Sequence, residues 1–217
     1  MSYLVGSSRV GNYLMSCQII ERFNLNINLI TIGASDAKAK SSKLCPNWYS
    51  RVNTLDKKKY TLFISSVHVR LNPNESYAAT KRREEEHVKH MFPKCLILRT
   101  ENIIGLPEKD GKFEIMKYVK RRKPSLLLDN EYKNFLPARM LGVTIGKLCG
   151  QNITGIVEVG SIYPVSPLEL YSFYHSADAE LELTTAQICS RRQTVNHDPL
   201  LKYIGEDEMK IKRWHLV

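Results

Sequence analysis

Short apolar segments alternate with longer polar or amphipathic segments through the first half of the chain, and this alternation limits the possible folds more than any other feature. Each apolar segment is rich in Val, Ile, Leu or Phe and has the length of a β-strand, whereas the segments between them can hold helices. Such alternation is typical of a Rossmann-like α/β fold, with a mostly parallel sheet and helices on both faces. The four apolar segments are "YLV" (3–5), "INLITIG" (27–33), "YTLFISSVHV" (60–69) and "KCLILRTENIIG" (94–105).

The segments between these strands predict three helices in the first half. An amphipathic helix is expected to end near Phe23, a second lies within residues 34–60, and a charged helix begins near Tyr77. The sequence "KRREEEHVKH" in that last helix indicates a solvent-facing surface with few core contacts before Val88 and Met91.

The second half of the chain has weaker periodicity. "FLPARMLGVTIGKLC" (135–149) predicts a helix and "NITGIVEVGS" (152–161) a strand. "PVSPLELYSFYHS" (164–176) predicts a helix with Ser166 as its N-cap. The last segment (205–217) is expected to be a final strand or a tail.

The composition predicts a protein without a membrane-spanning segment that binds an anionic partner. The 217 residues include 32 Lys and Arg against 22 Asp and Glu, a net charge of +10, which favours nucleic acid, nucleotide phosphates or an acidic surface. No apolar run reaches the roughly 18 to 20 residues that span a bilayer, and we find no signal peptide, so a cytoplasmic location without membrane contact is expected. Five scattered cysteines, without a CxxC pair, disfavour both a disulfide framework and a metal site and suggest buried apolar side chains.

A glycine turn follows the first predicted strand. It reads Gly6-Ser7-Ser8-Arg9-Val10-Gly11 and opens the first predicted helix. Backbone N–H groups at such a turn and the helix N-terminus can hold the diphosphate of a dinucleotide. Ser8 stands where the fingerprint has its middle glycine, so the pattern also fits an ordinary strand-to-helix turn.

Residues at the end of the second predicted strand would contact the adenine ribose of a bound dinucleotide. Ser35 and Lys38 leave room for a 2′-phosphate and favour NADP(H) over NAD(H), whereas Asp36 would be the ribose ligand of NAD(H).

Tyr77 and Lys81 share a face of the charged helix because they are four residues apart. A lysine ammonium one turn away favours the ionised phenol by Coulomb attraction, so the tyrosine can exchange protons. Ser65 and Ser66 end the third predicted strand, and a serine hydroxyl there could hold a substrate oxygen beside the phenol. A surface tyrosine and lysine on a helix remain the alternative for the spacing alone.

The order of these motifs resembles the extended branch of the short-chain dehydrogenase/reductase superfamily, which acts on nucleotide sugars. The family pattern is a strand ending in Ser-Ser/Thr, then Tyr-x-x-x-Lys-x-x-x-Glu, then Leu-Arg-x-x-Asn-x-x-Gly. This chain reads "FISSVHV", "YAATKRREE" and "LRTENIIGLP", and "GIVEVGSIYPVSPLEL" is similar to the family's late strand and helix. The resemblance extends from Tyr3 to about Tyr171.

The resemblance implies a role for each matched residue. Tyr77 would be the catalytic acid/base, Lys81 would assist the phenol and bind the nicotinamide ribose, and Ser66 would hydrogen-bond the substrate oxygen. Asn102 would lie near the diphosphate of the nucleotide sugar, and Arg99 is interpreted as structural. The turn residues 6–11 with Ser35, Lys38 and Lys81 would bind the cofactor.

The implied organisation has two parts. Residues 1–110 would form a shortened NAD(P)-binding domain to which 153–175 return, and residues 111–152 and 176–217 would form a small C-terminal substrate lobe. The basic run 117–123 in that lobe could also meet the sugar's diphosphate.

Two departures qualify this resemblance. The family fits three further strands between its glycine turn and its serine strand, but only "INLITIG" is a clear strand here, so fewer strands than usual are expected and a homodimer could restore the missing wall. Val67 and His68 follow Ser66 where dehydratases of the family carry acids, which disfavours water elimination and favours a keto-sugar reductase. A nucleotide-sugar epimerase with bound NAD, and a non-catalytic binding or regulatory relative, remain alternatives; nucleic acid is the less favoured partner.

Overall fold

The computed structural model describes residues 3–5, 24–31, 48–105, 132–176 and 195–211. The chain forms two compact units. The first contains Met1–Thr100 and Val143–Glu158, and the second contains Glu101–Gly142 and Val159–Val217. Each unit is described by itself.

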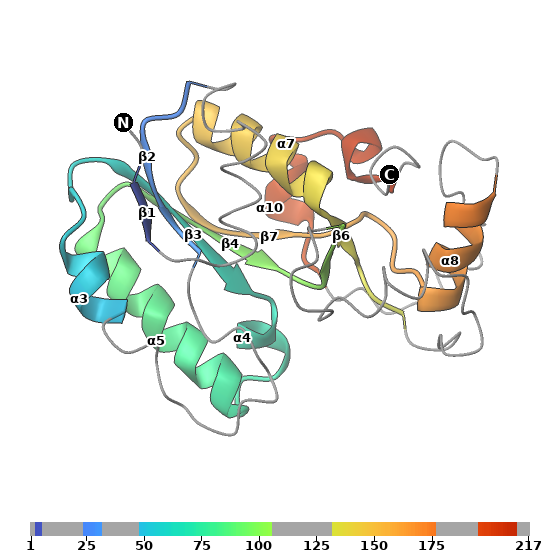
Figure 1. The fold of residues 1–217 in the computed structure, drawn as a ribbon, viewed down its shortest axis with the longest axis horizontal. Helices are drawn as coiled ribbons and strands as arrows, with labels where there is room; N and C mark the ends of the chain where they lie inside the picture. Colours follow the sequence, from blue (N-terminus) through green and yellow to red (C-terminus); the bar gives the residue numbers. More distant parts are fainter. Residues whose placement is uncertain (1–2, 6–23, 32–47, 106–131, 177–194, 212–217) are drawn as a thin grey trace. The chain divides into compact units, whose positions relative to one another are not determined.

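A five-stranded sheet forms the centre of the first unit, with strand order β1-β2-β3-β4-β7 (Figure 1). Its first four strands run parallel to their neighbours, which confirms the predicted α/β fold with a parallel sheet. All seven residues of β3 are buried, as expected for a central parallel strand covered on both faces. The strands are β1 (Tyr3–Val5), β2 (Ile27–Ile30), β3 (Tyr60–Ser66), β4 (Cys95–Thr100) and β7 (Gly155–Val159).

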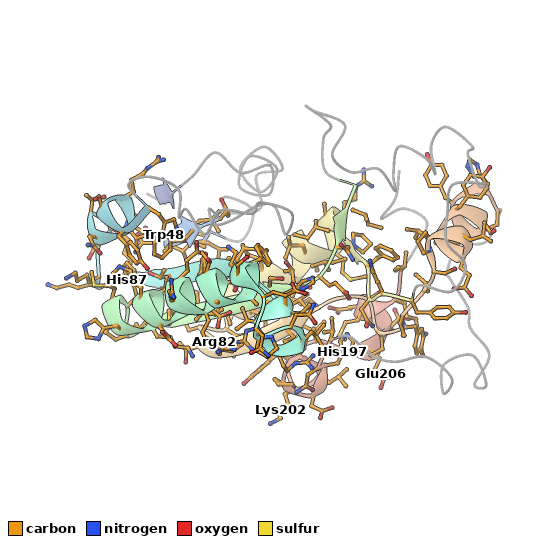
Figure 2. All side chains as sticks on the ribbon, turned by 90° about the horizontal axis from the view of Figure 1, so that it is seen from below. Trp48, Arg82, His87, His197, Lys202 and Glu206 are labelled. Atoms are coloured by element: carbon orange, nitrogen blue, oxygen red, sulfur yellow. The ribbon has the colours of Figure 1, made fainter. Side chains whose placement is uncertain are left out.

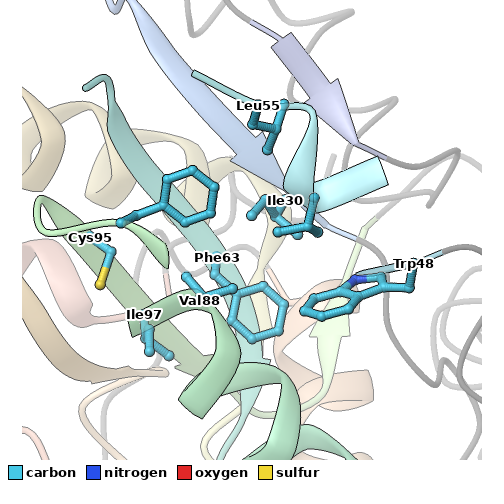
Figure 3. Close-up of a cluster of buried hydrophobic side chains, with 9 residues drawn as sticks. Ile30, Trp48, Leu55, Phe63, Val88, Cys95 and Ile97 are labelled. Carbon is cyan, nitrogen blue, oxygen red and sulfur yellow. The ribbon is translucent and has the colours of Figure 1, made fainter. Parts of the chain in front are cut away.

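Helices α3 (Trp48–Asn53) and α5 (Ser76–Met91) pack on one face of this sheet. Trp48, Phe63 and Phe92 are the largest members of the apolar cluster between helices and strands (Figure 3). The Trp48 ring also contacts the His87 ring of α5, with centroids 5.6 Å apart (Figure 2). The cluster is completed by Ile30, Val52, Leu55, Val88, Cys95 and Ile97.

The predicted solvent-facing character of α5 is wrong for half of the helix. Ala78, Thr80, Lys81, Glu84, Glu85 and Val88 are all buried. The charged side chains can be buried because ion-pair partners meet them inside the unit, as described below. The other half of the helix, which includes Arg83, Glu86 and Lys89, is exposed.

The third predicted strand is shorter than its apolar sequence suggests. β3 ends at Ser66, and His68–Leu71 form the short helix α4 instead of the end of a strand. Arg82 of α5 donates a hydrogen bond from Nη2 to the carbonyl oxygen of Val69, 3.2 Å away, which holds α4 beside α5 (Figure 2). The polypeptide therefore turns back at the end of β3, towards the start of α5.

Two buried cysteines also lie in the first unit, as predicted for the cysteines in the described residues. Burial raises the pKa of the Cys149 thiol to about 12 and also raises that of Cys95. The Tyr60 hydroxyl donates to the carbonyl oxygen of Ile153, and burial raises the pKa of this phenol.

The second unit contains the two-stranded parallel pair of β5 (Ile103–Ile104) and β6 (Leu136–Pro137). The fourth predicted strand is therefore interrupted after Thr100. Helix α7 (Ala138–Gly150) begins in this unit and ends in the first, and it starts three residues later than predicted. The segment near the C-terminus forms the 3₁₀ helix η2 (Glu206–Met209), so the prediction of a strand or tail is wrong there.

Helix α8 (Pro167–His175) begins as the sequence predicted. The Ser166 hydroxyl accepts from the Glu169 N–H, and the Glu169 carboxylate accepts from the Ser166 N–H, which forms a capping box. Leu170 and Phe173 of α8 pack in an apolar cluster with Ile104, Phe135, Val165 and Ile211. The short helix α10 (Asp198–Leu201) completes the described helices, and none of these is long and apolar enough to cross a membrane.

Candidate functional site

The carboxyl ends of β3 and β4 carry the first predicted site residue. Ser66 is the last residue of β3 and pairs in register with Thr100, the last residue of β4. The Ser66 side chain is buried, and its Oγ accepts a hydrogen bond from the backbone N–H of His68, 3.3 Å away. This is the sheet edge at which ligands bind in parallel α/β folds.

Tyr77 is the second residue of α5 and lies near the same chain reversal. Its half-buried ring meets the His68 ring edge-on, with centroids 5.9 Å apart. His68 therefore contacts Ser66 through its backbone N–H and Tyr77 through its ring. The His68 Nδ1 lies 3.0 Å from Asn72 Nδ2 and 3.9 Å from Glu75 Oε2.

Lys81 is one helical turn beyond Tyr77 and is 5% exposed. Its ammonium lies 3.0 Å from Oε2 of Glu84 and 5.2 Å from the centroid of the Phe63 ring. The sequence predicted a lysine available to a phenol and a ribose. In this structure the ammonium is already paired with a carboxylate that the motif did not indicate.

Glu84 is completely buried, and among the described residues neither of its carboxylate oxygens has a well-directed hydrogen-bond donor. The short distance to Lys81 is thus an ion pair without good hydrogen-bond geometry. Burial raises the pKa of Glu84, and the charge of Lys81 opposes this effect only in part. The carboxylate is held in an unfavourable environment for a charge.

Glu85, the next residue, is buried in a very different environment. Its carboxylate accepts from Ser65 Oγ at 2.7 Å and from Nε and Nη2 of Arg99 at 2.9 and 2.7 Å. This two-pronged arginine–carboxylate pair ties α5 to β3 and β4. The structural role predicted for Arg99 agrees with these contacts.

Arg70 and Glu158 extend this network and were not found from the sequence. Arg70 donates from Nε and Nη2 to the two oxygens of Glu158, at 2.8 and 2.7 Å, and these hydrogen bonds raise the pKa of Arg70. Arg99 Nη1 lies 3.9 Å from Glu158 Oε1. The sequence did contain a signal for this pair. Glu158 is an acidic residue within the apolar strand "GIVEV", and a buried carboxylate usually has a cationic partner. The network fixes α4, and with it His68, to the end of the sheet.

The other predicted site residues cannot be placed in this arrangement. The turn residues Gly6–Gly11, together with Ser35, Lys38 and the basic run 117–123, lie outside the described residues. Asn102 belongs to the second unit, where its side chain is exposed and its carbonyl oxygen accepts from the Leu136 N–H at 3.1 Å. The described residues contain no group of three or more His, Cys, Asp or Glu side chains that could hold a metal ion.

The strand order decides how a dinucleotide could approach. A doubly wound sheet binds its dinucleotide where the strand order reverses. In the described sheet, the order β1-β2-β3-β4-β7 follows the chain without a reversal, so β1 is an edge strand. The described residues contain one strand, β2, between β1 and β3, as counted from the sequence. The described strands therefore show no switch point at which the adenosine half of a dinucleotide would bind.

The parallel sheet of the first unit can be compared with the folds of known proteins. The chain shares its fold with solved structures of nucleotide-sugar reductases and epimerases, the kind of fold that the sequence motifs predicted. No protein-family profile matches the chain, and no curated protein sequence matches it.

Three solved structures illustrate this similarity. RMD from Pseudomonas aeruginosa, complexed with NADPH, has a TM-score of 0.66 at 17% identity, over 94% of this chain and 92% of that one. A dTDP-4-dehydrorhamnose reductase from Clostridium acetobutylicum has a TM-score of 0.62 at 14% identity, over 100% and 97% of the two chains. A UDP-galactose 4-epimerase has a TM-score of 0.56 at 15% identity, over 100% and 96%. At these identities the comparisons establish the shared fold.

Proposed function

We propose that this chain is an NAD(P)H-dependent oxidoreductase that reduces a keto group on a nucleotide-linked sugar. The observation that carries the proposal is that Ser66 and Tyr77 both contact His68, which follows the carboxyl end of β3. A hydroxyl and a phenol at this edge of a parallel sheet can hold and protonate one substrate oxygen. The fold shared with nucleotide-sugar reductases supports the substrate class.

In the proposed reaction, Ser66 donates a hydrogen bond to the carbonyl oxygen of the keto sugar and orients it beside Tyr77. The Tyr77 hydroxyl transfers its proton to that oxygen as the carbonyl carbon is reduced to a carbinol. A nicotinamide cofactor, when bound, would supply the hydride for this reduction. Lys81 stays paired with Glu84 and offers its remaining N–H groups to a ribose hydroxyl.

NADP(H) is the proposed cofactor and NAD(H) the less favoured one. Ser35 and Lys38 provide room and charge for a 2′-phosphate in the sequence, and RMD from Pseudomonas aeruginosa, a structure of the same fold, contains NADPH. In this proposal the turn Gly6–Gly11 holds the diphosphate, Asn102 contacts the nucleotide sugar, and pairing of two copies completes the cofactor wall.

A second candidate is a non-catalytic relative that keeps the fold for binding or regulation. Two observations favour it: the described strand order has no reversal, and the Lys81 ammonium is already paired with a buried carboxylate. An epimerase that retains NAD is the third candidate, supported by the fold shared with UDP-galactose 4-epimerase.

Ligand binding and turnover separate these candidates. A reductase is expected to be stabilised by NADPH, by about 2.7 kcal/mol at 100 times the dissociation constant, and to oxidise NADPH when given dTDP- or UDP-linked 4-keto sugars. Tyr77→Phe is expected to abolish turnover while thermal stability and NADPH binding persist. Tyr49→Phe is the matched control, because the Tyr49 ring of α3 contacts His87, ten residues beyond Tyr77 on α5, and Tyr49 is not a site residue.

Each outcome assigns the chain to one candidate. Absence of NADPH and NADH binding would refute the oxidoreductase and leave the non-catalytic relative. NAD that stays bound through purification, with no net NADPH oxidation, would favour the epimerase. Full activity in Tyr77→Phe would refute the proton-transfer role.

A further inference from the structure

Two adjacent glutamates of α5 are buried, but their surroundings differ. Glu85 accepts three hydrogen bonds, from Ser65 and Arg99, and the network accounts for its burial. Glu84 is 0% exposed, and neither of its carboxylate oxygens has a well-directed hydrogen-bond donor among the described residues. A buried carboxylate with so little compensation destabilises the fold unless a cation stays beside it.

The cation beside Glu84 is Lys81, a residue of the proposed reaction site. The Lys81 Nζ lies 3.0 Å from Glu84 Oε2, and the Phe63 ring lies below it at 5.2 Å. Phe63 is fully buried in the core cluster and so provides a rigid surface for the ammonium (Figure 3). If Lys81 moved away to reach a ligand, Glu84 would remain as an unpaired buried charge, which makes that movement unfavourable.

We propose that Glu84 is a positioning residue for Lys81: its buried carboxylate holds the ammonium at a fixed place on the Tyr77 side of α5. Lys81 then acts from that place through hydrogen bonds to neutral hydroxyl groups. It does not act as a mobile cation that closes on a phosphate. The inference deepens the proposed function, since it names the residue that holds Lys81 in place, and it rests on that function.

The net charge of the Lys81–Glu84 pair explains why Lys81 would contact neutral hydroxyl groups and not a phosphate. An ammonium and a carboxylate 3.0 Å apart have almost no net charge, so their attraction for a distant anion is weak. An ammonium with one partner still has hydrogen atoms for two further acceptors. A ribose hydroxyl beside the reacting ring fits this donor, whereas the phosphates of a dinucleotide must be bound by other residues.

Two ligands distinguish positioning of Lys81 from a general effect on the protein. NADPH contains the nicotinamide ribose, and 2′,5′-ADP contains only the adenosine half with its phosphates. We expect Glu84→Gln to weaken NADPH binding at least about tenfold, because the ammonium loses its fixed place and its hydrogen bond to the ribose. Binding of 2′,5′-ADP should change less than twofold. Glu86→Gln, which removes an exposed carboxylate from the same helix, is the control and should change neither affinity.

A measurement on the unaltered protein keeps the inference testable if Glu84→Gln does not fold. The Lys81 ammonium, labelled with ¹⁵N and assigned by Lys81→Met, should give a resonance protected from hydrogen exchange without any ligand. Glu84→Asp, which keeps the charge on a shorter side chain, should fold and show intermediate exchange and affinity.

The results separate failure of the inference from failure of the proposed function. Equal NADPH affinity in the wild type and Glu84→Gln, or an ammonium that exchanges as fast as exposed lysines, overturns the inference alone. If the wild type binds neither NADPH nor NADH, the proposed function fails, and the cofactor role of Lys81 fails with it. Parallel loss of NADPH and 2′,5′-ADP binding in Glu84→Gln shows a global effect and also overturns the positioning role.

Discussion

Removing the Lys81 ammonium is expected to destabilise the protein, whatever it does to catalysis. Lys81→Met keeps most of the side-chain volume and leaves the completely buried Glu84 without its partner. Loss of one partner from a buried ion pair costs about 3–5 kcal/mol. For a chain of this size each kcal/mol lowers the melting temperature by about 2–4 °C, so a decrease of roughly 6–20 °C is expected.

A second substitution, Glu84→Met, removes the unpaired buried carboxylate that causes this loss of stability. In Lys81→Met/Glu84→Met both charges are replaced by apolar side chains of similar length, and buried pairs replaced in this way often leave stability unchanged or increased. The double variant should therefore melt well above Lys81→Met. The difference between the double effect and the sum of the single effects gives the coupling energy, which is expected to be at least about 3 kcal/mol because the double variant recovers the loss caused by Lys81→Met.

The destabilisation by Lys81→Met should also depend on pH. Burial raises the pKa of Glu84, so the folded protein binds a proton on this group more readily than the unfolded chain does. Below the pKa of about 4.3 that Glu84 has in the unfolded chain, its carboxyl group is protonated in both the folded and the unfolded state and does not reduce folding stability. As pH rises from there through the raised folded pKa, the folded state loses stability relative to the unfolded state. Lys81→Met removes the charge that lowers the pKa of Glu84, so this pKa rises further in the variant. The loss of folding stability caused by Lys81→Met should therefore be smaller at pH 4.5 than at pH 7.5.

Thermal unfolding followed by circular dichroism, for the wild type, both single variants and the double variant at pH 4.5 and 7.5, measures all three effects. Arg83→Met, at an exposed position of the same helix, is the control and should change stability by less than about 0.5 kcal/mol. Strictly additive single effects would refute the coupling between Lys81 and Glu84. A penalty that does not change with pH would refute the burial of a charged Glu84.

Three further pairs of substitutions test the packing of the two units, in the same thermal assay. Arg99→Met leaves the buried Glu85 carboxylate without its two hydrogen bonds from arginine and should cost about 3–5 kcal/mol. Arg70→Met should cost less, about 1–3 kcal/mol, because Arg70 is 42% exposed and Arg99 Nη1 still lies 3.9 Å from the buried Glu158; a larger loss for Arg70→Met than for Arg99→Met would contradict this difference. Gly160→Ala would place its Cβ 2.8 Å from the Asn134 carbonyl oxygen and should cost about 1–3 kcal/mol, while Gly150→Ala meets nothing within 4 Å and should stabilise by up to about 1 kcal/mol. Ser166→Ala removes the capping box of α8 and should cost about 1 kcal/mol, with Ser166→Asp restoring most of it; no change in either variant would show that the cap does not stabilise the unit.

The sequence was most informative where local patterns agree with the final packing. The apolar runs became β2, β3 and β4 because buried parallel strands need continuous apolar sequence. Ser166 capped α8 because its hydroxyl and the Glu169 backbone are neighbours in the chain. Local patterns failed at the end of β3, where "VHV" has strand-like residues but His68 begins a helix that is held by Arg82 and Glu158 from distant elements.

The candidate site also has one part that the sequence predicts and one part that depends on the tertiary structure. The order of Ser66, Tyr77 and Lys81 along the chain could be found from the sequence, since strand end, loop and helix start are consecutive. The contacts of His68 with Ser66 and Tyr77 could not, because they depend on the turn that α4 makes after β3.

The sequence by itself determined an α/β sheet of parallel strands and the presence of a serine, a tyrosine and a lysine near one strand end. Only the tertiary structure decided the strand order and the burial of half of the charged helix α5. The reason is that the free energy of burying a charge depends on which partner reaches it. Glu85 meets Arg99 from β4, whereas Glu84 meets only Lys81 among the described residues, and nothing in two adjacent glutamates reveals that difference.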